Sequence, residues 1–376
     1  MGSVGGRGPA AVYINASARA TPNAMPSATP NAMPSHAPSP DSGLATLWLA
    51  VRARARKPAM GMPGVRSGAG AIAGLDRLVL SLVGARLVAF GVGECGGDGL
   101  RAGLLILAAA VATELVSPAS YSLVSLLTPL YLAARALLHS SGAGVTWRQL
   151  ALLLPITVLY IGGPMSLCLH RYFSHRAFQT SRALQLLLAV GATLAYQGGP
   201  LWWAAMHVRH HKHCEGPDDP HCVSRQGFWY AWLGWMADAR NYAPRRADLA
   251  TLDPGFARAE LRAVQALHPV FPVGLCLLAQ HALGHGAMLW GFLLPMLLCR
   301  LITCLFNVEF HPARALASAA PCAAINDDRF LAKLVGESQH HDHHSNPRRS
   351  RRPDWDLPWW ASVAWMQPLG LVWDCR

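Results

Sequence analysis

Histidines at regular spacing are the residues of this sequence best suited to chemistry. Fifteen of the 17 histidines lie between His170 and His344, and nine of these fifteen form the words HRYFSH (170–175), HVRHH (207–211) and HHDHH (340–344). Spacings of three and four residues place imidazoles on one face of a helix. Neutral imidazoles are good ligands for iron or zinc. The three words therefore predict a metal site with eight candidate ligands: His170, His175, His207, His210, His211, His340, His343 and His344.

The number of imidazoles favours two metal ions over one. A catalytic zinc ion takes three protein ligands and a water, so one such ion would leave most of the eight candidate histidines without a metal. Two irons with open positions suit eight imidazoles and can reduce O₂, which redox-silent zinc cannot do. His170 and His175 are about 140° apart around an α-helix, so they suit a site at a helix end. Outside the ligand set we expect surface, interfacial or outer-contact histidines: His139, His213, His221, His268, His281, His285 and His341.

The nine cysteines are scattered and form no CxxC pair. Several of them, such as Cys168 and Cys299, lie inside apolar runs, where cysteine behaves as a small apolar residue. We therefore expect no disulfide scaffold, and polar parts that face a reducing compartment.

Composition indicates a helical membrane protein in which these histidines lie at the ends of spans. The chain is 52% apolar and 14% charged, whereas soluble domains carry roughly 25% charged residues. These values exclude a disordered chain, an acidic tail protein and a collagen-like fibre. The run Gln149–Leu169 covers about 31 Å, one hydrocarbon core. Further apolar runs follow the same pattern: Leu78–Val92, Leu100–Val116, Tyr121–His139, Val270–Leu283 and Met288–Phe306.

Two of the apolar segments have special features. Leu184–Tyr196 is short for a span, so we expect it to lie in the interface or to re-enter. Arg300 interrupts the last run and needs a polar partner or a polar cavity. The formal charge is +12, and basic residues gather after Leu169 and again after His311. The positive-inside rule places both segments, with their histidines, on the cytosolic side or its stromal equivalent.

The words around the histidines carry a family resemblance. HRYFSHRAFQTSRALQ, QGGPLWWAAMHVRHHKHCEGPDDPH, GFWYAWLGW and GESQHHDHHSNP resemble the three-histidine-box membrane fatty acid desaturases over about Tyr121 to Trp360. The closest likeness is to their acyl-CoA Δ9 (stearoyl-CoA-type) branch. The resemblance implies an all-α, multispanning fold with four core transmembrane helices, and one or two extra spans before them. A cytosolic-side helical cap would hold a di-iron site.

The resemblance also implies further site residues. The family has nine histidine ligands, and the ninth lies in an N-x-x-x-H word, which makes His311 a candidate ligand and Asn307 the residue that holds a metal-bound water. Glu337 and Asp342 are candidate acceptors for imidazole N–H groups, with solvated charge as the alternative, and Glu309 is a candidate outer partner or alters the surroundings of one iron. Four cations near the boxes could bind a CoA head group, although topology alone also explains them: Arg171, Arg176, Arg209 and Lys212. Five aromatic residues either line the acyl path or anchor the interface: Trp202, Trp203, Phe228, Trp229 and Trp235.

The implied activity is an O₂-dependent desaturation that places a cis double bond, Δ9-type, in a saturated fatty acyl chain, carried as acyl-CoA or on a lipid. The chain has no HPGG word and no GxGxxG after a strand, so we expect a separate electron donor, cytochrome b5 or ferredoxin. We expect membrane lipid and no nucleic acid as a partner. The endoplasmic reticulum is the first candidate location, and a plastid membrane is the second.

Alternatives remain at this stage. A di-iron acyl or sterol hydroxylase could use the same scaffold, whereas a His-rich metal transporter would place ligands near the bilayer midplane rather than at helix ends.

The sequence also predicts how the chain is divided. Residues 1–75 are a disordered tail or a transit peptide and contain the repeat TPNAMPSA and TPNAMPSH. Residues 76–120 are additional apolar segments. The desaturase domain follows at 121–360, and 361–376 form a C-terminal tail.

Overall fold

The computed structural model describes residues 99–138, 146–242, 248, 252–313, 322–353 and 355–376. The predicted region 1–75, the run Leu78–Val92 and His139 lie outside these residues. The described part is mainly helical, as expected from its composition, with one two-stranded sheet.

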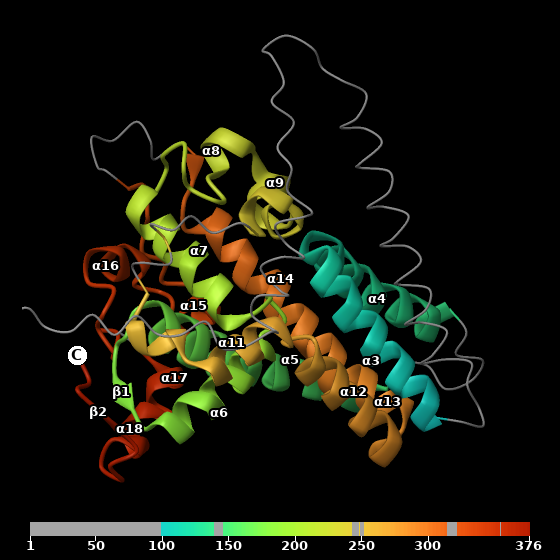
Figure 1. Ribbon diagram of the computed structural model, residues 1–376. Helices are drawn as coiled ribbons and strands as arrows, with labels where there is room; N and C mark the ends of the chain where they lie inside the picture. Colours follow the sequence, from blue (N-terminus) through green and yellow to red (C-terminus); the bar gives the residue numbers. More distant parts are fainter. Residues whose placement is uncertain (1–98, 139–145, 243–247, 249–251, 314–321, 354) are drawn as a thin grey trace, which may run out of the picture. The chain divides into compact units, whose positions relative to one another are not determined.

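Long apolar helices form one half of the described structure (Figure 1). They are α3 (Gly99–Val116), α4 (Pro118–Leu138), α5 (Trp147–Tyr160) with its π-helical continuation η1 (Ile161–Ser174), α12 (Val270–Leu283), α13 (His285–Met288), η5 (Leu289–Leu293) and α14 (Leu294–Glu309). Leu152, Leu154 and Leu159 of α5 are exposed by 58%, 59% and 68%. Such a leucine-covered surface suits lipid and not water.

Two continuous helices are long and apolar enough to cross a membrane, Trp147–Ser174 and His285–Glu309. A third crossing is added if Ala259–Ala266 and Val270–Leu283, which meet at 63°, count as one span. The 28 residues of the first helix extend about 42 Å, more than the roughly 30 Å of a hydrocarbon core. One end of this helix therefore projects beyond the hydrocarbon. Leu184–Tyr196 corresponds to α6 (Arg182–Thr193), which is apolar but shorter than these spans.

Shorter elements build a cap around the ends of the spans (Figure 1). Two of them carry histidine words, α7 (Pro200–His213) and α16 (His340–Ser345). The others are α8 (Val223–Gln226), α9 (Phe228–Trp232), η2 (Gly234–Ala237), η3 (Ala239–Tyr242), η4 (Pro254–Ala257), α11 (Ala259–Ala266), α15 (Phe330–Leu334), α17 (Leu357–Trp360) and α18 (Val363–Met366). The core beneath them joins η1, α6 and α7 through buried rings such as Tyr172, Phe173 and Trp202.

The C-terminal segment folds back onto the first histidine word. Strand β1 (Gln179–Thr180) pairs antiparallel with β2 (Val372–Trp373), and the N–H of Arg376 donates to the carbonyl of Ala177. Residues 361–376, which we expected to form a tail, are therefore packed into the cap.

Arg300 meets the expectation that it needs a polar partner. Its guanidinium is 2% exposed within α14 and donates to the carbonyl and hydroxyl of Ser122 and to the hydroxyl of Ser125, at 2.8–3.1 Å. Both serines lie on α4. The bonds therefore connect α4 and α14 at a depth where water is scarce.

A buried ion pair fastens the end of the first span to the C-terminal segment. Arg171 is 1% exposed, and its Nη1 and Nη2 donate to the two carboxylate oxygens of Asp356 at 2.8 and 2.7 Å. Nη1 also donates to the carbonyl of Ser350. Gly336 (φ +75°) makes room for the pair, because a Cβ there would lie 2.9 Å from Arg171 Nη2 and from Asp356 Oδ1.

Asp356→Ala should leave the buried Arg171 charge without its bidentate partner and destabilise the protein by about 3–5 kcal/mol. The loss should appear as a lower midpoint of thermal unfolding for the full chain in lipid nanodiscs. Asp374→Ala is the matched control, because Asp374 pairs with Arg376 at the surface, where ion pairs contribute about 0–1 kcal/mol. Equal effects of the two substitutions would contradict the structural role of the buried pair.

Candidate metal centre

The first histidine group, defined as His170, His175, His207, His211 and His343, gathers five ring nitrogens within 4.8 Å of one another. Nε2 of His170 lies 2.9 Å from Nε2 of His343. Nε2 of His207 lies 2.9 Å from that of His175 and 3.1 Å from that of His211. The group combines histidines from all three words, carried by η1 and its C-cap, α7 and α16.

The second histidine group consists of His210, His311, His340 and His344. Nε2 of His340 lies 3.1 Å from that of His311 and 3.3 Å from that of His344. The His210 ring completes the group, with its centroid 4.7 Å from that of His311 and 5.1 Å from that of His344. The two groups adjoin, because the rings of His211 and His344 stack at 4.1 Å.

The π-helix explains the spacing of the first word. The N–H of His175 donates to the carbonyl of His170, five residues back, which is the π-helical pattern. The two rings consequently lie on the same side of the chain, with centroids 4.9 Å apart. The pair does lie at a helix end, with His175 as the C-cap of η1, but the 140° separation we expected assumed an α-helical period. Pro164 inside η1 lacks the N–H that an α-helical ladder would need.

The nitrogen positions fit bound metal ions better than mutual hydrogen bonds. One ring N–H can satisfy one contact between neutral imidazoles, yet Nε2 of His207 and Nε2 of His340 each face two other Nε2 atoms. Ligands at about 2.0–2.1 Å from one ion lie about 3.0–3.4 Å apart for right-angle to tetrahedral geometry. The observed separations of 2.9–3.3 Å are close to that range.

Burial keeps these rings in the neutral form that binds metal. It is the largest influence, followed by neighbouring charges, and it lowers the pKa well below the usual 6.5 for His175, His207, His211, His340, His343 and His344. Metal ions require deprotonated imidazole nitrogen. The groups are therefore ready to accept ions at neutral pH.

Carboxylates orient three of the rings from behind. Nδ1 of His170 donates to Oε1 of Glu337 at 3.1 Å, as expected for an outer acceptor. Nδ1 of His210 donates to both oxygens of Asp219 at 3.1 Å, and Nδ1 of His311 lies 3.3 Å from Glu215. Burial raises the pKa of Asp219, but the nearby rings of His210 and His221 outweigh it and leave the pKa below its usual value. Such partners fix the tautomer of a ligand ring.

Asp219 and Glu215 were missed by the sequence analysis, although both lie in the quoted word CEGPDDPH after the second histidine word. The signal that could have found them is the presence of acidic residues within ten residues of the end of the helix that carries candidate ligands. His221, expected as an outer contact or a surface residue, is buried against His210 with ring centroids 4.4 Å apart. Burial, followed by the charge of His210, lowers its pKa to about 3.

Two of the predicted carboxylate partners lie elsewhere. Glu309 is 41% exposed at its side chain and pairs with Arg329 at 3.1 Å. Asp342 accepts from Arg349 at 2.9 Å. Neither carboxylate has a bond to a candidate ligand ring among the described contacts, and both instead pair with arginines.

The predicted head-group cations are mostly engaged within the fold. Arg171 is committed to Asp356, and Arg209 is buried and donates to Asp248 at 2.5 and 3.0 Å. Arg176 pairs with Asp253 and lies over the Phe256 ring. Lys212 is exposed at the end of α7. Arg171 and Arg209 are thus buried and ion-paired, and a head-group role for the four cations stays a prediction.

A small cavity opens beside the histidine groups. Its lining includes His170, His207 and His340 together with Asn307, the predicted water-holding residue. Trp203 and Trp235 also line it, whereas Trp202 is buried in a stack with Tyr242, and Phe228 and Trp229 are 41% and 70% exposed. Two of the five aromatic candidates for an acyl path therefore line the cavity.

One wall of this cavity is fixed by hydrogen bonds. Nε1 of Trp203 donates to Oε1 of Gln197 at 3.0 Å, and Nε2 of Gln197 donates to the hydroxyl of Thr303 at 2.5 Å. The Trp203 ring also stacks on His207, with centroids 4.8 Å apart. The wall is thereby held in a set position relative to the first histidine group.

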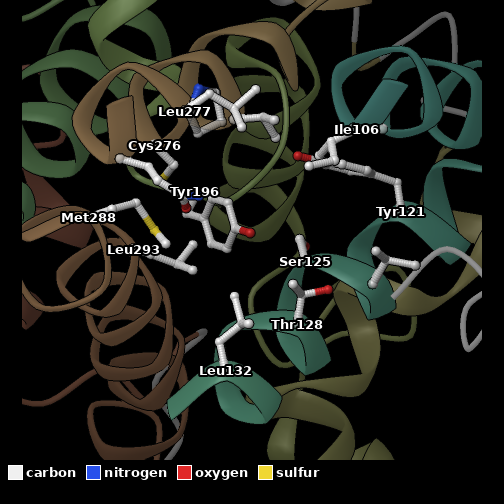
Figure 2. Close-up of a pocket in the computed structure, with 15 residues that line it drawn as sticks. Ile106, Tyr121, Ser125, Thr128, Leu132, Tyr196, Cys276, Leu277, Met288 and Leu293 are labelled. Carbon is white, nitrogen blue, oxygen red and sulfur yellow. The ribbon is translucent and has the colours of Figure 1, made fainter. Parts of the chain in front are cut away.

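A second small cavity lies among the apolar helices (Figure 2). Leu132, Leu293, Met288 and Cys276 surround it, and Tyr196 projects into it. Tyr196 adjoins Gln197, which lines the cavity beside the histidines.

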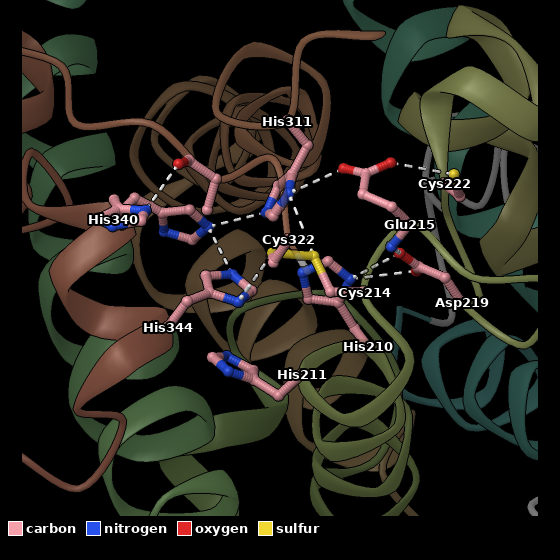
Figure 3. Close-up of a disulfide and its surroundings, with 12 residues drawn as sticks. His210, His211, Cys214, Glu215, Asp219, Cys222, His311, Cys322, His340 and His344 are labelled. Atoms are coloured by element: carbon pink, nitrogen blue, oxygen red, sulfur yellow. Dashed lines mark hydrogen bonds and ion pairs between the residues drawn. A yellow bond between two sulfur atoms is a disulfide. The ribbon is translucent and has the colours of Figure 1, made fainter. Parts of the chain in front are cut away.

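The structure contradicts the expectation about cysteine. Cys214 and Cys322 form a disulfide that spans 108 residues and lies beside the second histidine group (Figure 3). Sγ of Cys214 is 3.7 Å from Nδ1 of His311, and Sγ of Cys322 is 3.5 Å from Nδ1 of His344. Neither cysteine occurs in a CxxC word, because the pair is formed only by tertiary folding.

Comparison of the chain with known proteins shows the family to which it belongs. Residues 146–367, more than half of the chain, match the family described as fatty acid desaturase. The chain belongs to the fatty acid desaturase family. The match includes every residue of the two histidine groups, and an enzyme of this type is therefore established.

Related desaturases differ in the carrier of the acyl chain. The sn-1 stearoyl-lipid 9-desaturase of Anabaena variabilis is 30% identical over 238 residues, 60% of this chain and 84% of that protein. Delta-9 acyl-lipid desaturase 2 of Arabidopsis thaliana is 29% identical over 255 residues, 62% of this chain and 81% of the relative. A "Probable acyl-CoA desaturase" of Schizosaccharomyces pombe is 32% identical over 199 residues, 48% of this chain and 39% of that protein.

Glu337→Gln should lower the affinity of the desaturase for metal by about 10–100-fold, because an amide orients the His170 ring less strongly than a carboxylate. Titration of the metal-free protein with Fe²⁺ under anaerobic conditions measures the effect. Glu309→Gln is the matched control, since Glu309 pairs with Arg329 and should leave the affinity unchanged. Equal affinities in the two variants would exclude the role of Glu337.

The metal-free desaturase should lose stability as pH falls below about 6.5. The folded-state pKa of the buried rings is lowered, so the unfolded chain binds more protons and stability decreases toward acid. Each such ring should contribute a slope of about 1.4 kcal/mol per pH unit. Thermal unfolding between pH 7.5 and 5.5 measures this slope, and His207→Ala should make it shallower. A midpoint independent of pH would contradict the buried neutral state.

Proposed function

We propose that this desaturase introduces a cis double bond, Δ9-type, into a saturated fatty acyl chain, with O₂ as co-substrate and two irons held by the nine histidines. The observation that carries the proposal is the pair of adjoining histidine groups beside a cavity lined by both ring nitrogens and apolar side chains. When bound, the irons would supply the reduction of O₂ and the removal of two hydrogens from adjacent methylenes.

The protein's own contribution is to position the ligands and exclude water. His170, His175, His207, His211 and His343 would hold one ion, and His210, His311, His340 and His344 the other. Glu337, Asp219 and Glu215 would keep the Nε2 atoms free for metal by accepting the Nδ1 protons. Asn307 lines the cavity with His340, which supports its proposed role of holding a water between the amide and an ion.

The cavity wall supports a role in placing the methylenes. Met165 and Phe306 give it apolar surface, and the Trp203–Gln197–Thr303 hydrogen bonds hold its shape. A fixed wall beside the first histidine group would decide which carbons of a bound chain come within reach. The cavity around Tyr196 has an almost entirely apolar lining, which supports it as the place for the remainder of the chain.

We propose four core spans for the membrane arrangement: α4, α5 with η1, α12 with α11, and α13 with η5 and α14. The 21 residues of α4 extend about 31 Å, which suits one crossing. Helix α3 would be an extra span or an interfacial segment. The histidines of η1, α7 and α16 would all lie in the cap on the cytosolic or stromal side, where cytochrome b5 or ferredoxin would deliver electrons. The endoplasmic reticulum is our first candidate membrane and a plastid membrane the second.

The carrier of the acyl chain is proposed as CoA, with a lipid-bound chain as the second candidate. Lys212 is the exposed member of the predicted head-group cations, so support for CoA from charge is reduced to one residue and the basic surroundings. The relatives' names include both stearoyl-lipid and acyl-CoA substrates. Incubation of enzyme-containing membranes with labelled stearoyl-CoA, or with the same chain on a glycerolipid, would distinguish the carriers.

His207→Ala and His343→Ala should each abolish desaturation, by at least 100-fold, because each removes a nitrogen at the centre of the first histidine group. The variants should be compared in a desaturase-deficient host, with double bonds mapped by mass spectrometry and membrane insertion checked by fractionation. His213→Ala is the control, since His213 lies on α7 outside both groups and should retain activity. Near-normal activity in either ligand variant would refute the assignment, and hydroxylated products would favour the hydroxylase alternative.

A further inference from the structure

The C-terminal segment carries large apolar side chains on its outer surface. Val363 and Val372 of this segment already pack into the core beneath the cap. We define the C-terminal tryptophan face as its large apolar side chains that are 42–66% exposed: Trp360, Trp365, Leu369, Leu371 and Trp373. Single exposed apolar residues are normal, but five within the 14 residues 360–373 indicate a surface that contacts something other than water.

The C-terminal tryptophan face lies beside a membrane span. Helix α17 packs on η1, where a Cβ at Gly162 would lie 3.6 Å from Cγ of Pro358. The span begins, at its end away from the cap, with Trp147, which is 73% exposed and has the guanidinium of Arg148 over its ring. Such a pair is typical of a membrane interface. From Trp147 to Gly162 the helix rises about 22 Å, less than the roughly 30 Å of a hydrocarbon core. Helix α17 therefore meets the span before the span has left the hydrocarbon.

A second apolar helix, α6, adjoins this face. Strand β1 leads directly into α6, and its partner strand β2 carries Trp373. The hydroxyl of Thr180 donates to the carbonyl of Leu371 at 2.8 Å. Helix α6 exposes Leu186 and Leu187 and, like α17, packs on η1. In Figure 1, α6, α17 and α18 lie together at the lower left. The cap thus has one side on which apolar side chains from two distant parts of the sequence are exposed.

A cation lies at the edge of the C-terminal tryptophan face. The guanidinium carbon of Arg351 lies 5.1 Å from the ring centroids of both Trp359 and Trp360. Tryptophan rings are enriched at the level of lipid head groups, and a basic side chain there is attracted to lipid phosphate. The combination of exposed tryptophans and an adjoining arginine fits the head-group layer of a bilayer.

We propose that the C-terminal tryptophan face lies in the lipid interface on the cap side of the membrane, with Arg351 on lipid phosphate. The inference rests on Trp147–Ser174 being a span, and not on the reaction that the metal centre performs. Lipid is favoured over a protein partner because α17 meets this span at the height of the hydrocarbon. A second copy of the chain is the other occupant that the experiment distinguishes.

This contact would fix the height of the metal centre above the hydrocarbon. Strand β2 pairs with the backbone just after His175, and α17 packs on the helix that carries His170. An apolar chain that enters from the membrane would therefore meet the first histidine group at a constant depth.

Photo-crosslinking of the full chain in lipid nanodiscs tests the proposal. The discs contain phosphatidylcholine and phosphatidylglycerol, and adducts are detected by intact-mass spectrometry after irradiation. Trp360→p-benzoylphenylalanine and Trp365→p-benzoylphenylalanine should each give lipid adducts. Phe330→p-benzoylphenylalanine is the matched control and should give none. Phe330 is also exposed, by 70%, but it lies on α15 near the charged pair Asp328 and Lys333.

Replacement of Arg351 tests its phosphate contact. In the chain labelled at Trp360, Arg351→Gln should lower the adducts with phosphatidylglycerol about five-fold, the effect of one basic residue near an anionic membrane surface. Arg240→Gln is the control, because it removes an exposed arginine that pairs with Asp238. Equal adducts in the two variants would refute the phosphate contact.

Hydroxyl-radical footprinting of the unmodified chain covers the case in which a labelled chain does not fold. Trp365 and Trp373 should lose their oxidation in nanodiscs, whereas Phe330 should be oxidised as its exposure predicts. Oxidation of both tryptophans in nanodiscs, or no lipid adduct at Trp360 and Trp365, would overturn the proposal. Adducts between two copies of the chain would assign the face to a dimer and refute the membrane contact. None of these measurements requires desaturation, so this proposal and the proposed reaction fail separately.

Discussion

Nine imidazoles that converge on one another inside a protein are the constraint on which the described structure depends. The rings are buried or partly buried, and the facing nitrogens cannot all be satisfied by ring-to-ring hydrogen bonds. Protonation is no remedy, because burial and like charge oppose it. Metal ions resolve this conflict by accepting several lone pairs at once. Without bound metal, the histidine groups therefore destabilise the folded state, and the surrounding packing must offset this unfavourable free energy.

Buried ion pairs hold the helices that carry the candidate ligands, and the acidic partners lie far away in the sequence. Arg171 follows a candidate ligand directly, and its bidentate bonds reach Asp356, 185 residues later. Arg209 precedes another and is held by Asp248. We expected both arginines to bind a head group because they are basic and lie near the histidine words. Because both arginines are buried and ion-paired, they instead stabilise the positions of η1 and α7.

Spacing along the sequence was sufficient to predict which histidines gather but not what surrounds them. The words at 170–175, 207–211 and 340–344 identify the rings that gather in the two groups. The same sequence offered Glu309 and Glu337 as equivalent acceptors, and only folding across 167 residues brings Glu337 to His170. The π-helix could not be predicted from an α-helical period, although Pro164 and the two glycines before it indicate a segment with weak α-helical backbone hydrogen bonding. The disulfide was likewise invisible, because its partners share no local motif.

The pairing of β1 with β2 has a consequence for biogenesis. Val372 and Trp373 of β2 pair with Thr180 and Gln179 of β1, about 190 residues earlier, just after His175. Because a ribosome adds residues in order, β1 stays unpaired until the later apolar helices and the third histidine word have been made. The backbone next to the first histidine word is therefore fixed after the residues of the other two words have been synthesised. A nascent chain in the translocon would hold its first histidines without this support.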